Sequence, residues 1–569
     1  MTEIGALTAD DIFLPGADPG LAFFTTPDPV PQRLTGGPAV EALCLASDWP
    51  QRLSAVEHML RQRRQRSFPD GLRFCTLPAV ATDLRIAQGI VTLGGKALFT
   101  GAAGLRLLTR LGRLPAADRA QPFEQLLSGI GARARANPLD FAQAPPADRA
   151  LDLVIPARNL FNYFHFTTET LPALSLVSRH GLTGRIVIHS HKPEEAGFLR
   201  DQIARLYPEL AGRVVLSHGV FEAARALIPF DTTFLYHLAR DPRLGTIDRM
   251  VPASPDWMPR RMAERSVKTL LMNRCEGALA DLRADVLARL GPVAGGRRLY
   301  VTRRPGRRDR AVVGGTALQA MLTDLGFETL DFEDLDALGQ ARAMAGAAIV
   351  VAGHGAGLAN MLFCPPDALV VELSTLQTLQ ARLGDFNGVA LASGARHLHL
   401  VVDHDWPDPA AVPDIDRDGH VGQRLGPEQI AILRARLLAE IDPVAQAKRL
   451  ARLQALNDAR DFPALQAALA EGADFLRHLP EAQVWAANAA QARGDAPAVL
   501  AHLVQAMALA PRRAGLVQRT LLAAHRARDR DLFGRAALAL FRADPAGAAA
   551  LFAQRGWDAR AFRPAGAED

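Results

Sequence analysis

The chain has 569 residues, of which 49% are hydrophobic and 22% charged, an ordinary mixture for a globular protein. It carries 65 basic and 60 acidic residues, and the resulting net charge of +5 is too small at this length to indicate a nucleic-acid-binding protein. Its four cysteines stand far apart without a CxxC pair, which argues against a disulfide framework or a cysteine-rich zinc site and favours a reducing compartment.

The N-terminus has no basic segment followed by an apolar core, so it does not resemble a secretory signal. No apolar run reaches the roughly 18 residues that a membrane-spanning helix needs. We therefore expect a cytoplasmic protein, with peripheral attachment to the inner membrane left open. A basic cluster can touch RNA or anionic lipid, but it lacks interleaved aromatic residues, which favours a solvated helix face; it comprises Arg61, Arg63, Arg64 and Arg66.

Residues 1–150 mix short apolar runs with Pro and Gly and predict an N-terminal α/β region of unclear role. Beyond them, predicted strands alternate with predicted helices; the strands cover 151–155, 185–189 and 213–216, and the helices cover 161–180, with a break at Pro172, and 193–206. Such alternation is typical of a parallel sheet with helices on both faces. Residues 151–255 are therefore predicted to form a first doubly wound, Rossmann-like domain.

A second unit of the same kind is predicted over residues 256–425. Its strands cover 298–302, 328–331, 347–352 and 369–373, and its helices cover 316–326 and 335–346. The α/β part of the chain is thus expected to consist of two doubly wound domains that face a cleft.

Residues 426–569 are rich in alanine and predict an all-α region. The interval from Pro511 to Pro545 equals the period of tetratricopeptide helix pairs, although another packing of helix pairs remains open. Helical arrays of this kind bind protein partners, and no catalytic pattern is visible in this region.

The strongest local pattern is a buried-type strand that ends in Gly353-His354-Gly355-Ala356-Gly357 and leads into a helix. Glycine lets the backbone approach a ligand closely, and the unpaired amides at a helix start attract an anion. This geometry suits a diphosphate. The loop matches neither GxGxxG nor a P-loop, which argues against a dinucleotide or ATP. The alternative is a tight turn whose glycines serve packing alone.

One strand further on, Glu372 can accept hydrogen bonds from ribose hydroxyls, or it is a solvated charge at a strand end. A second pattern is Asn162, His165 and Glu169, which fall on one face of a predicted helix among phenylalanines. Aligned polar groups on an otherwise buried helix suit an acid/base site, with a structural His165–Glu169 pair as the alternative.

Arg303 and Arg304 follow a predicted strand, where they can neutralise a departing diphosphate. A solvated loop is the alternative, and it explains the next arginines, Arg307, Arg308 and Arg310, better than these two. Asp403 and Asp405 form a DxD pair after another strand and can hold a metal ion, although acidic turns are common without one. The alternating histidines before this pair, His397 and His399, can also serve a metal ion.

With these motifs in place, residues 150 to about 400 resemble glycosyltransferase family 61. The resemblance rests on three blocks in the same order and at similar spacing: Asn162-Tyr-Phe-His165 through Glu169 to Leu171-Pro172; Thr302-Arg303-Arg304; and His354 to Asn360, followed by Pro365-Pro366 and Glu372. Gly314-Gly315 stand where the family usually carries Asn-Glu.

The resemblance implies a GT-B-like fold in which 151–255 is the acceptor-side domain and 256–425 the nucleotide-sugar donor domain. It implies an inverting, metal-independent transfer from a UDP-sugar, which argues against the DxD site. It also implies Asn360 as a donor-binding residue and a place in the synthesis of capsule, lipopolysaccharide or another cell-surface polysaccharide. The partners implied are a nucleotide-sugar, which is a co-substrate and not a cofactor, and a glycan or lipid-linked glycan acceptor. A protein partner at the helical region adds to these, and nucleic acid is not expected.

The combined hypothesis places the donor diphosphate on the turn at 353–357, with His354, Arg303 and Arg304 around it and Glu372 on the ribose. The acceptor enters beside Asn162, and His165 or Glu169 removes its proton. Two alternatives stay open: an inactive scaffold in a polysaccharide-assembly complex, and a metal-dependent transferase that uses Asp403 and Asp405.

Overall fold

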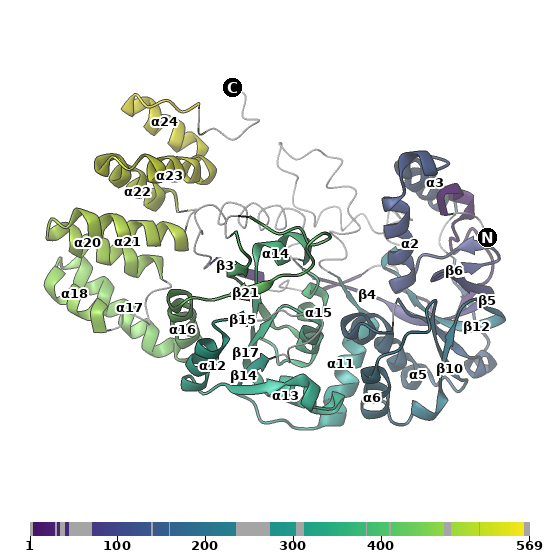
Figure 1. Cartoon of the computed structure of the whole chain (residues 1–569). Helices are drawn as coiled ribbons and strands as arrows, with labels where there is room; N and C mark the ends of the chain where they lie inside the picture. The colour runs from purple at the N-terminus through teal and green to yellow at the C-terminus, as the bar shows by residue number, and fades with distance from the viewer. Residues whose placement is uncertain are drawn as a thin grey trace.

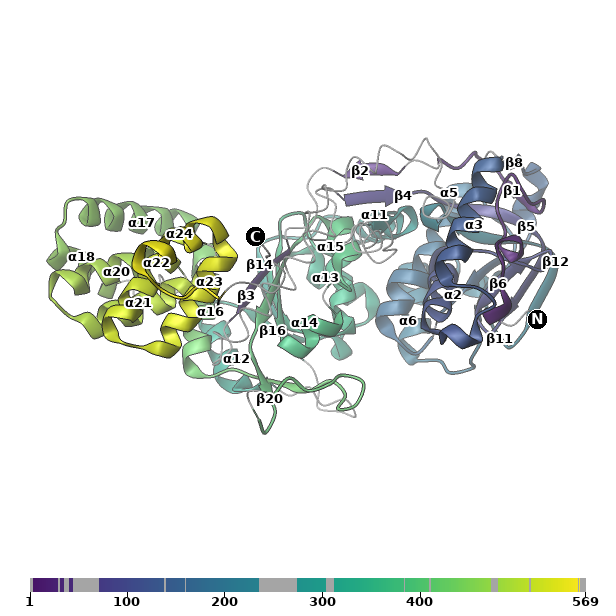
Figure 2. The same ribbon diagram turned by 90° about the horizontal axis from the view of Figure 1, so that it is seen from above.

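The computed structural model describes residues 4–28, 31–34, 40–44, 71–137, 140–158, 160–234, 274–302, 312–382, 384–408, 411–471, 479–510, 513–560 and 562. Several predicted features lie outside these residues: the basic cluster from Arg61 to Arg66, the pair Arg303 and Arg304, the domain boundary at 255, and Pro511. The described part is a mixed α/β structure followed by a helical C-terminal region, and the two views show three parts in a row (Figures 1 and 2).

The first part is built on a nine-stranded mixed sheet. Its main path runs β11 (Val214–His218), β10 (Ile186–Ser190), β9 (Leu153–Pro156), β12 (Phe221–Asp231), β5 (Thr76–Ala87), β1 (Leu21–Phe23) and β8 (Ala142–Gln143), with β6 (Ile90–Leu93) and β7 (Lys96–Ala97) beside β5. β9, β10 and β11 are parallel, and β12 pairs parallel with β9 but antiparallel with β5. The described strands within residues 151–255 thus run parallel as predicted, but the sheet continues into antiparallel strands from the N-terminal region, which the prediction did not include.

The boundary predicted at residue 150 does not mark a break in the structure. β5 and β1 belong to the same sheet as β9, and helices α2 (Gly101–Arg113) and α3 (Phe123–Ala136) add to this part of the molecule. β3 (Val40–Cys44) instead pairs with the last strand of the second sheet. The N-terminal region thus contributes strands to both sheets. Each sheet therefore includes strands from outside the domain predicted for it.

The second sheet has six parallel strands in the order β16 (Glu328–Asp331), β14 (Arg297–Thr302), β17 (Ala347–Gly353), β18 (Leu369–Ser374), β19 (Arg396–Val401) and β3. β17 and β18 are almost wholly buried, as expected for strands covered on both faces. The chain order reverses between β14 and β17. In open parallel sheets, ligands bind beyond the carboxyl ends of the strands at such a reversal.

The two sheets share one continuous apolar core. It includes Leu153 and Ile188 from the first sheet and Val350 and Val370 from the second. Helix α11 (Gly277–Leu290) contributes Leu282 to this core and contacts helices on both sides, including α5 (Ser175–His180) and α13 (Ala337–Ala345). This shared core holds the two sheets together around the site described below.

The helical region begins later than predicted. Helix α16 (Pro427–Ile441) inserts Ile430, Leu433 and Leu437 into the apolar cluster of the second sheet, so the boundary predicted at residue 426 moves to the end of this helix. The helices that follow are α17 (Pro443–Asp458), α18 (Phe462–Glu471), α20 (Pro480–Ala492), α21 (Ala496–Leu509), α22 (Ala514–Ala527), α23 (Arg530–Ala543) and α24 (Pro545–Arg555).

These helices pack in sequence, each against its neighbour along the chain. Three aspartates that recur at equal intervals, Asp461, Asp495 and Asp529, each accept a backbone N–H three residues on and so cap a helix start. The capped helix starts therefore repeat with the same period as the interval from Pro511 to Pro545 in the sequence. None of the described helices is both long enough and apolar enough to cross a membrane.

Candidate functional site

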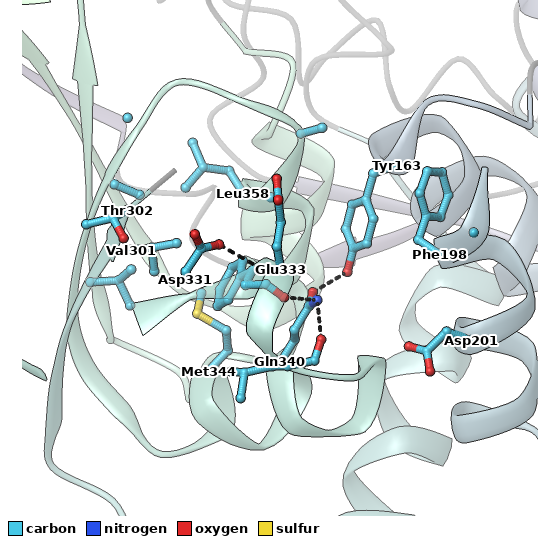
Figure 3. Close-up of a pocket in the computed structure, with 18 residues that line it drawn as sticks. Tyr163, Phe198, Asp201, Val301, Thr302, Asp331, Glu333, Gln340, Met344 and Leu358 are labelled. Atoms are coloured by element: carbon cyan, nitrogen blue, oxygen red, sulfur yellow. Dashed lines mark hydrogen bonds between the residues drawn. The ribbon is translucent and has the colours of Figure 1, made fainter. Parts of the chain in front are cut away.

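A cavity of about 470 Å³ lies at the reversal point of the second sheet, between the two α/β parts (Figure 3). The carboxyl ends of β14 and β17 contribute Thr302 and Gly353 to its wall. The first part contributes Tyr163, Phe198 and Asp201 on the opposite side. A small ligand in this cavity therefore contacts both α/β parts.

The glycine-rich turn forms one wall of this cavity. β17 ends at Gly353, and a 3-10 helix, η10 (Ala356–Phe363), begins two residues after His354. Gly353, Ala356 and Gly357 line the cavity, as does Leu358. A Cβ on Gly357 would lie 3.3 Å from the ring of Phe332, so glycine allows η10 to pack closely against that ring. The helix start thus borders the cavity, in the position expected for an anion site.

A hydrogen-bond network crosses from the first α/β part to the second beside the cavity. The Tyr163 hydroxyl lies 2.9 Å from Gln340 Oε1 and 2.8 Å from Asn360 Oδ1. The Asn360 amide donates to Gln340 Oε1 at 2.9 Å, and the Gln340 amide donates to the Phe332 carbonyl at 2.7 Å. Burial raises the pKa of the Tyr163 phenol to about 12, so the hydroxyl keeps its proton. Asn360, expected to contact the donor, is buried in this network.

His354 is held by a buried carboxylate. Its Nδ1 lies 2.6 Å from Glu372 Oε1, and His397 Nε2 lies 2.8 Å from Glu372 Oε2. Burial raises the pKa of Glu372, but the charge of His399 and the hydrogen bonds from His354 and His397 outweigh it and hold that pKa well below its usual range. An ionised carboxylate only accepts hydrogen bonds, so His354 donates through Nδ1 and its tautomer is set.

Glu372 is therefore not a surface charge, and the expected direct contact of its carboxylate with a ribose is not compatible with its position. It is 1% exposed, and both of its oxygens face histidines. Its register neighbour in β19 is His399. The ligand atoms of Glu372, His397 and His399 lie within 4.8 Å of one another, so these three residues have the donor types and the proximity to hold a divalent cation.

The DxD pair lies elsewhere and has protein partners. Asp403 accepts a hydrogen bond from Gln429 at 2.8 Å, and Asp405 forms an ion pair with Arg424 at 2.6 Å. Neither aspartate lines the cavity. The geometry therefore gives no support to a metal-dependent site at Asp403 and Asp405.

The predicted acid/base residues lie on an unusual helix. After α4 (Tyr163–His165), residues Phe166–Thr170 form a turn of π-helix and Leu171–Leu174 a 3-10 turn that contains Pro172. A π-turn widens the helix and is frequent at functional sites. The Asn162 side chain accepts a hydrogen bond from the His165 backbone N–H at 3.2 Å and caps the helix. Asn162 was expected to contact the acceptor, and this capping role was not predicted.

His165 Nδ1 lies 2.8 Å from Glu169 Oε1, and the Arg158 guanidinium lies 3.5 Å from the same oxygen. Burial raises the pKa of Glu169, but the hydrogen bond and charge of His165 and the charges of Arg158 and Arg274 lower it more, so the pKa ends below its usual value. The ionised carboxylate orients the histidine ring. In a pair of this kind the histidine accepts the proton and the carboxylate positions its ring.

The two histidines of the site are separated by aromatic rings. His165 packs on Phe164, which contacts Phe386, and Phe386 contacts His354, with successive centroid distances of 5.5, 5.3 and 5.6 Å. A chain of aromatic contacts through Phe164 and Phe386 therefore links His165 to His354.

Charge in the cavity is unevenly distributed. Asp201, Asp331 and Glu333 line it, and no Lys or Arg is found among its described lining residues. Thr302 lies at the cavity wall, and Arg303 and Arg304 follow it directly in the chain but lie outside the described residues. The carboxylates favour hydroxyl groups of a ribose or sugar, whereas a diphosphate needs positive charge from beyond the described wall.

Sequence reasoning assigned no role to several residues of this cavity, among them Tyr163, Gln340 and Asp331. Tyr163 stands inside the first motif but carried no assigned role, while Gln340 and Asp331 lie on elements that were predicted without functional residues. Asp331 ends β16, next to the reversal point, and an acidic residue at a strand end was the available signal.

Gly314 and Gly315 stand where the family pattern usually has Asn-Glu, and the local structure explains the glycine at 314. It has φ of 88°, and an added Cβ would overlap the Leu425 carbonyl. It precedes α12 (Gly315–Asp324) as its N-cap residue. A residue with a side chain is strained here, so this glycine serves the local fold.

Residues 163–371 match the family model described as Glycosyltransferase 61. The matched segment runs from the Tyr163 side of the cavity to β18 and includes the glycine-rich turn, and it ends before Glu372 and before the helical C-terminal region. A search of curated proteins found no match. The match supports this family for the α/β part of the chain and suggests glycosyltransferase activity.

Proposed function

We propose that this protein is a glycosyltransferase that moves a sugar from a nucleotide-sugar to a hydroxyl group of a glycan. The observation that carries the proposal is the cavity at the reversal of the second sheet, which lies within the segment that matches family 61. Its volume of about 470 Å³ lies within the range of small-molecule sites, and it has residues of both α/β parts in its wall.

The donor lies with its diphosphate against the turn at 353–357, where the start of η10 borders the cavity, and Arg303 and Arg304 neutralise its charge. Asp331 at the end of β16 takes the ribose hydroxyls in place of Glu372, since an acidic residue near the reversal point is the usual ribose ligand in such sheets. Glu372 acts by holding His354.

For the acceptor, His165 is the general base and Glu169 positions its ring. The acceptor oxygen attacks the anomeric carbon as its proton passes to His165, and the bond to the diphosphate breaks on the opposite face, so the anomeric configuration inverts. Amides and guanidinium groups stabilise the leaving diphosphate, so the transfer proceeds without a metal ion. EDTA is then expected to leave turnover unchanged.

The wider proposal is a UDP-sugar donor, a GT-B-like pair of α/β domains, and a role in the synthesis of a cell-surface polysaccharide in the cytoplasm, with peripheral attachment at the inner membrane. The regular spacing of the capped helix starts, which matches the period of tetratricopeptide helix pairs, supports a tetratricopeptide-like region. Such a region binds a protein partner, and it gives the enzyme a means to join an assembly complex.

A thermal-shift screen of UDP-, GDP- and CMP-sugars tests the donor site, because a bound ligand raises the unfolding midpoint by mass action. We expect a UDP-sugar to raise the midpoint and Asp331→Asn to reduce the shift. Asp324→Asn, on the far end of α12, is the matched control. If no nucleotide raises the unfolding midpoint and none gives a heat of binding in calorimetry, the protein is the inactive scaffold and the transferase proposal is wrong.

The chemical step is tested with Glu169→Gln beside Arg303→Ala. The first change keeps the shape of the side chain but removes the charge that orients His165, so turnover should fall about 100-fold or more. Arg303→Ala should raise the donor KM and lower kcat. If both variants transfer sugar as well as the unmodified protein, this assignment of the site is refuted.

A further inference from the structure

A second pocket, of about 570 Å³, opens beyond the carboxyl ends of β9 and β10 in the first sheet. Arg158 and Phe161 follow β9, and His191 and Lys192 follow β10, while Arg106 and Arg110 project from α2. The carboxyl edge of parallel strands is where α/β sheets bind ligands, so the pocket stands where the first sheet is expected to take its substrate.

The pocket is strongly cationic. Three guanidinium groups and one ammonium group line it, and in the described part of the chain one of these cations, Arg158, has a carboxylate against it, that of Glu169 at 3.5 Å. Burial and the charges of Arg158 and Arg110 lower the pKa of Arg106 to about 10, although Glu169 opposes the shift, and burial and neighbouring cations lower the pKa of His191 despite Glu194. The cations therefore repel one another, and a bound anion relieves that repulsion.

The backbone keeps the arginines in place. The Arg106 guanidinium donates to the Ala157 carbonyl at 3.2 Å, and Arg110 donates to the Gln88 carbonyl at 3.1 Å. Gly89, with φ of 74°, lies under Arg106, where any Cβ would overlap the guanidinium. Phe161 is 45% exposed at the same pocket and offers an apolar face for a sugar ring or a lipid chain.

We propose that this pocket binds the phosphate or diphosphate group of the acceptor, an assignment that rests on the transferase function proposed above. Arginine forks match phosphate oxygens in pairs, and a doubly charged phosphate offsets several cations where a single carboxylate offsets one. Arg158 joins the pocket to Glu169 and through it to His165, so an acceptor anchored here presents its hydroxyl toward the proposed base.

The first experiment measures the binding of inorganic pyrophosphate by calorimetry to protein saturated with UDP, so that the donor site is filled. The double variant Arg110→Ala/Lys192→Ala removes two cations from the pocket, and we expect its pyrophosphate Kd to rise about tenfold or more while its UDP Kd stays unchanged. The control, Lys448→Ala/Arg452→Ala, removes the same charge from exposed positions on α17 and should change neither constant.

Two results overturn the proposal. If the pocket variant loses UDP affinity as strongly as pyrophosphate affinity, the pocket is part of the donor site. If pyrophosphate binds both variants and the unmodified protein equally, the pocket does not bind phosphate. A protein that binds no UDP refutes the transferase function instead, and pyrophosphate binding by the unmodified protein and the two variants without UDP then still decides whether the pocket is an anion site.

Two probes distinguish a soluble from a lipid-linked source of the phosphate. Glucose 1-phosphate represents a soluble acceptor, and phosphatidylcholine vesicles with and without a polyprenyl phosphate represent a lipid-linked one. Binding to either probe that weakens in Arg110→Ala/Lys192→Ala supports the proposal and assigns the source, whereas binding to neither overturns the acceptor assignment.

Discussion

Removal of the Tyr163 hydroxyl tests whether the network beside the cavity fixes the two α/β parts relative to each other. Tyr163→Phe keeps the edge contact of the ring with Phe198, at a centroid distance of 5.2 Å, so the change is confined to the hydroxyl. Gln340 Oε1 keeps the Asn360 amide as its donor, whereas Asn360 Oδ1 loses the hydroxyl at 2.8 Å. Asn360 is 1% exposed, and a buried acceptor left without a donor costs about 1–3 kcal/mol.

The assay is thermal unfolding, in which we expect the midpoint to fall by a few degrees. Because the helical region can unfold separately, hydrogen-exchange protection of the amides in η10 and α13 is measured beside the midpoint. The control is Tyr300→Phe, since no hydrogen bond of the Tyr300 hydroxyl is found among the described residues and its ring is also buried. If Tyr163→Phe loses no more stability than this control, the network does not hold the two parts together.

Two further predictions concern stability. Burial raises the pKa of Glu440, but hydrogen bonds from Arg396 and Arg436 lower it to about 2. The stability that this carboxylate contributes is therefore present above about pH 4.5 and is lost as the pH falls toward 2. Glu440→Gln should destabilise the protein at pH 7 by about 1–2 kcal/mol, after allowance for solvent screening, and should flatten the acid side of the curve of midpoint against pH. Leu521→Ala, at a fully buried position in α22, should destabilise the helical region by about 2–5 kcal/mol and leave UDP affinity unchanged; a loss of UDP binding would contradict the separation of that region from the donor site.

The centre of the second sheet was predictable because its central strands are buried on both faces. Apolar runs predicted 347–352 and 369–373, and the structure has Ala347–Gly353 and Leu369–Ser374. The first sheet was not predictable in the same way. Pro78 in β5 and Pro229 in β12 lie opposite each other in the ladder, and proline within a run argues against a strand. The pairing of two long, proline-containing strands that lie far apart in the chain depends on tertiary contacts, which local sequence patterns do not reveal.

The candidate site shows the same limit. The spacing of His165 and Glu169 predicted a contact, and their side chains meet at 2.8 Å, because four residues along a helix bring side chains to one face. Glu372 was expected at a strand end, and the sequence could not show that it lies buried beside His397 and His399. That depends on the register between β18 and β19, which sets which side chains share a face of the sheet.

The charges around the donor cavity lead to a prediction about Arg303 and Arg304. The described wall holds Asp201, Asp331 and Glu333 and no described cation, so a diphosphate placed there without these arginines meets only helix amides and repulsive carboxylates. Uridine carries no such charge and should bind through its ribose and base alone. We therefore expect UDP to bind the unmodified protein more tightly than uridine, and Arg303→Ala/Arg304→Ala to reverse that order while uridine affinity stays the same. Calorimetry with both ligands measures the ratio directly. A double variant that still prefers UDP would mean that the diphosphate does not depend on these arginines, and the cationic pocket of the first sheet would then be the better candidate for its position.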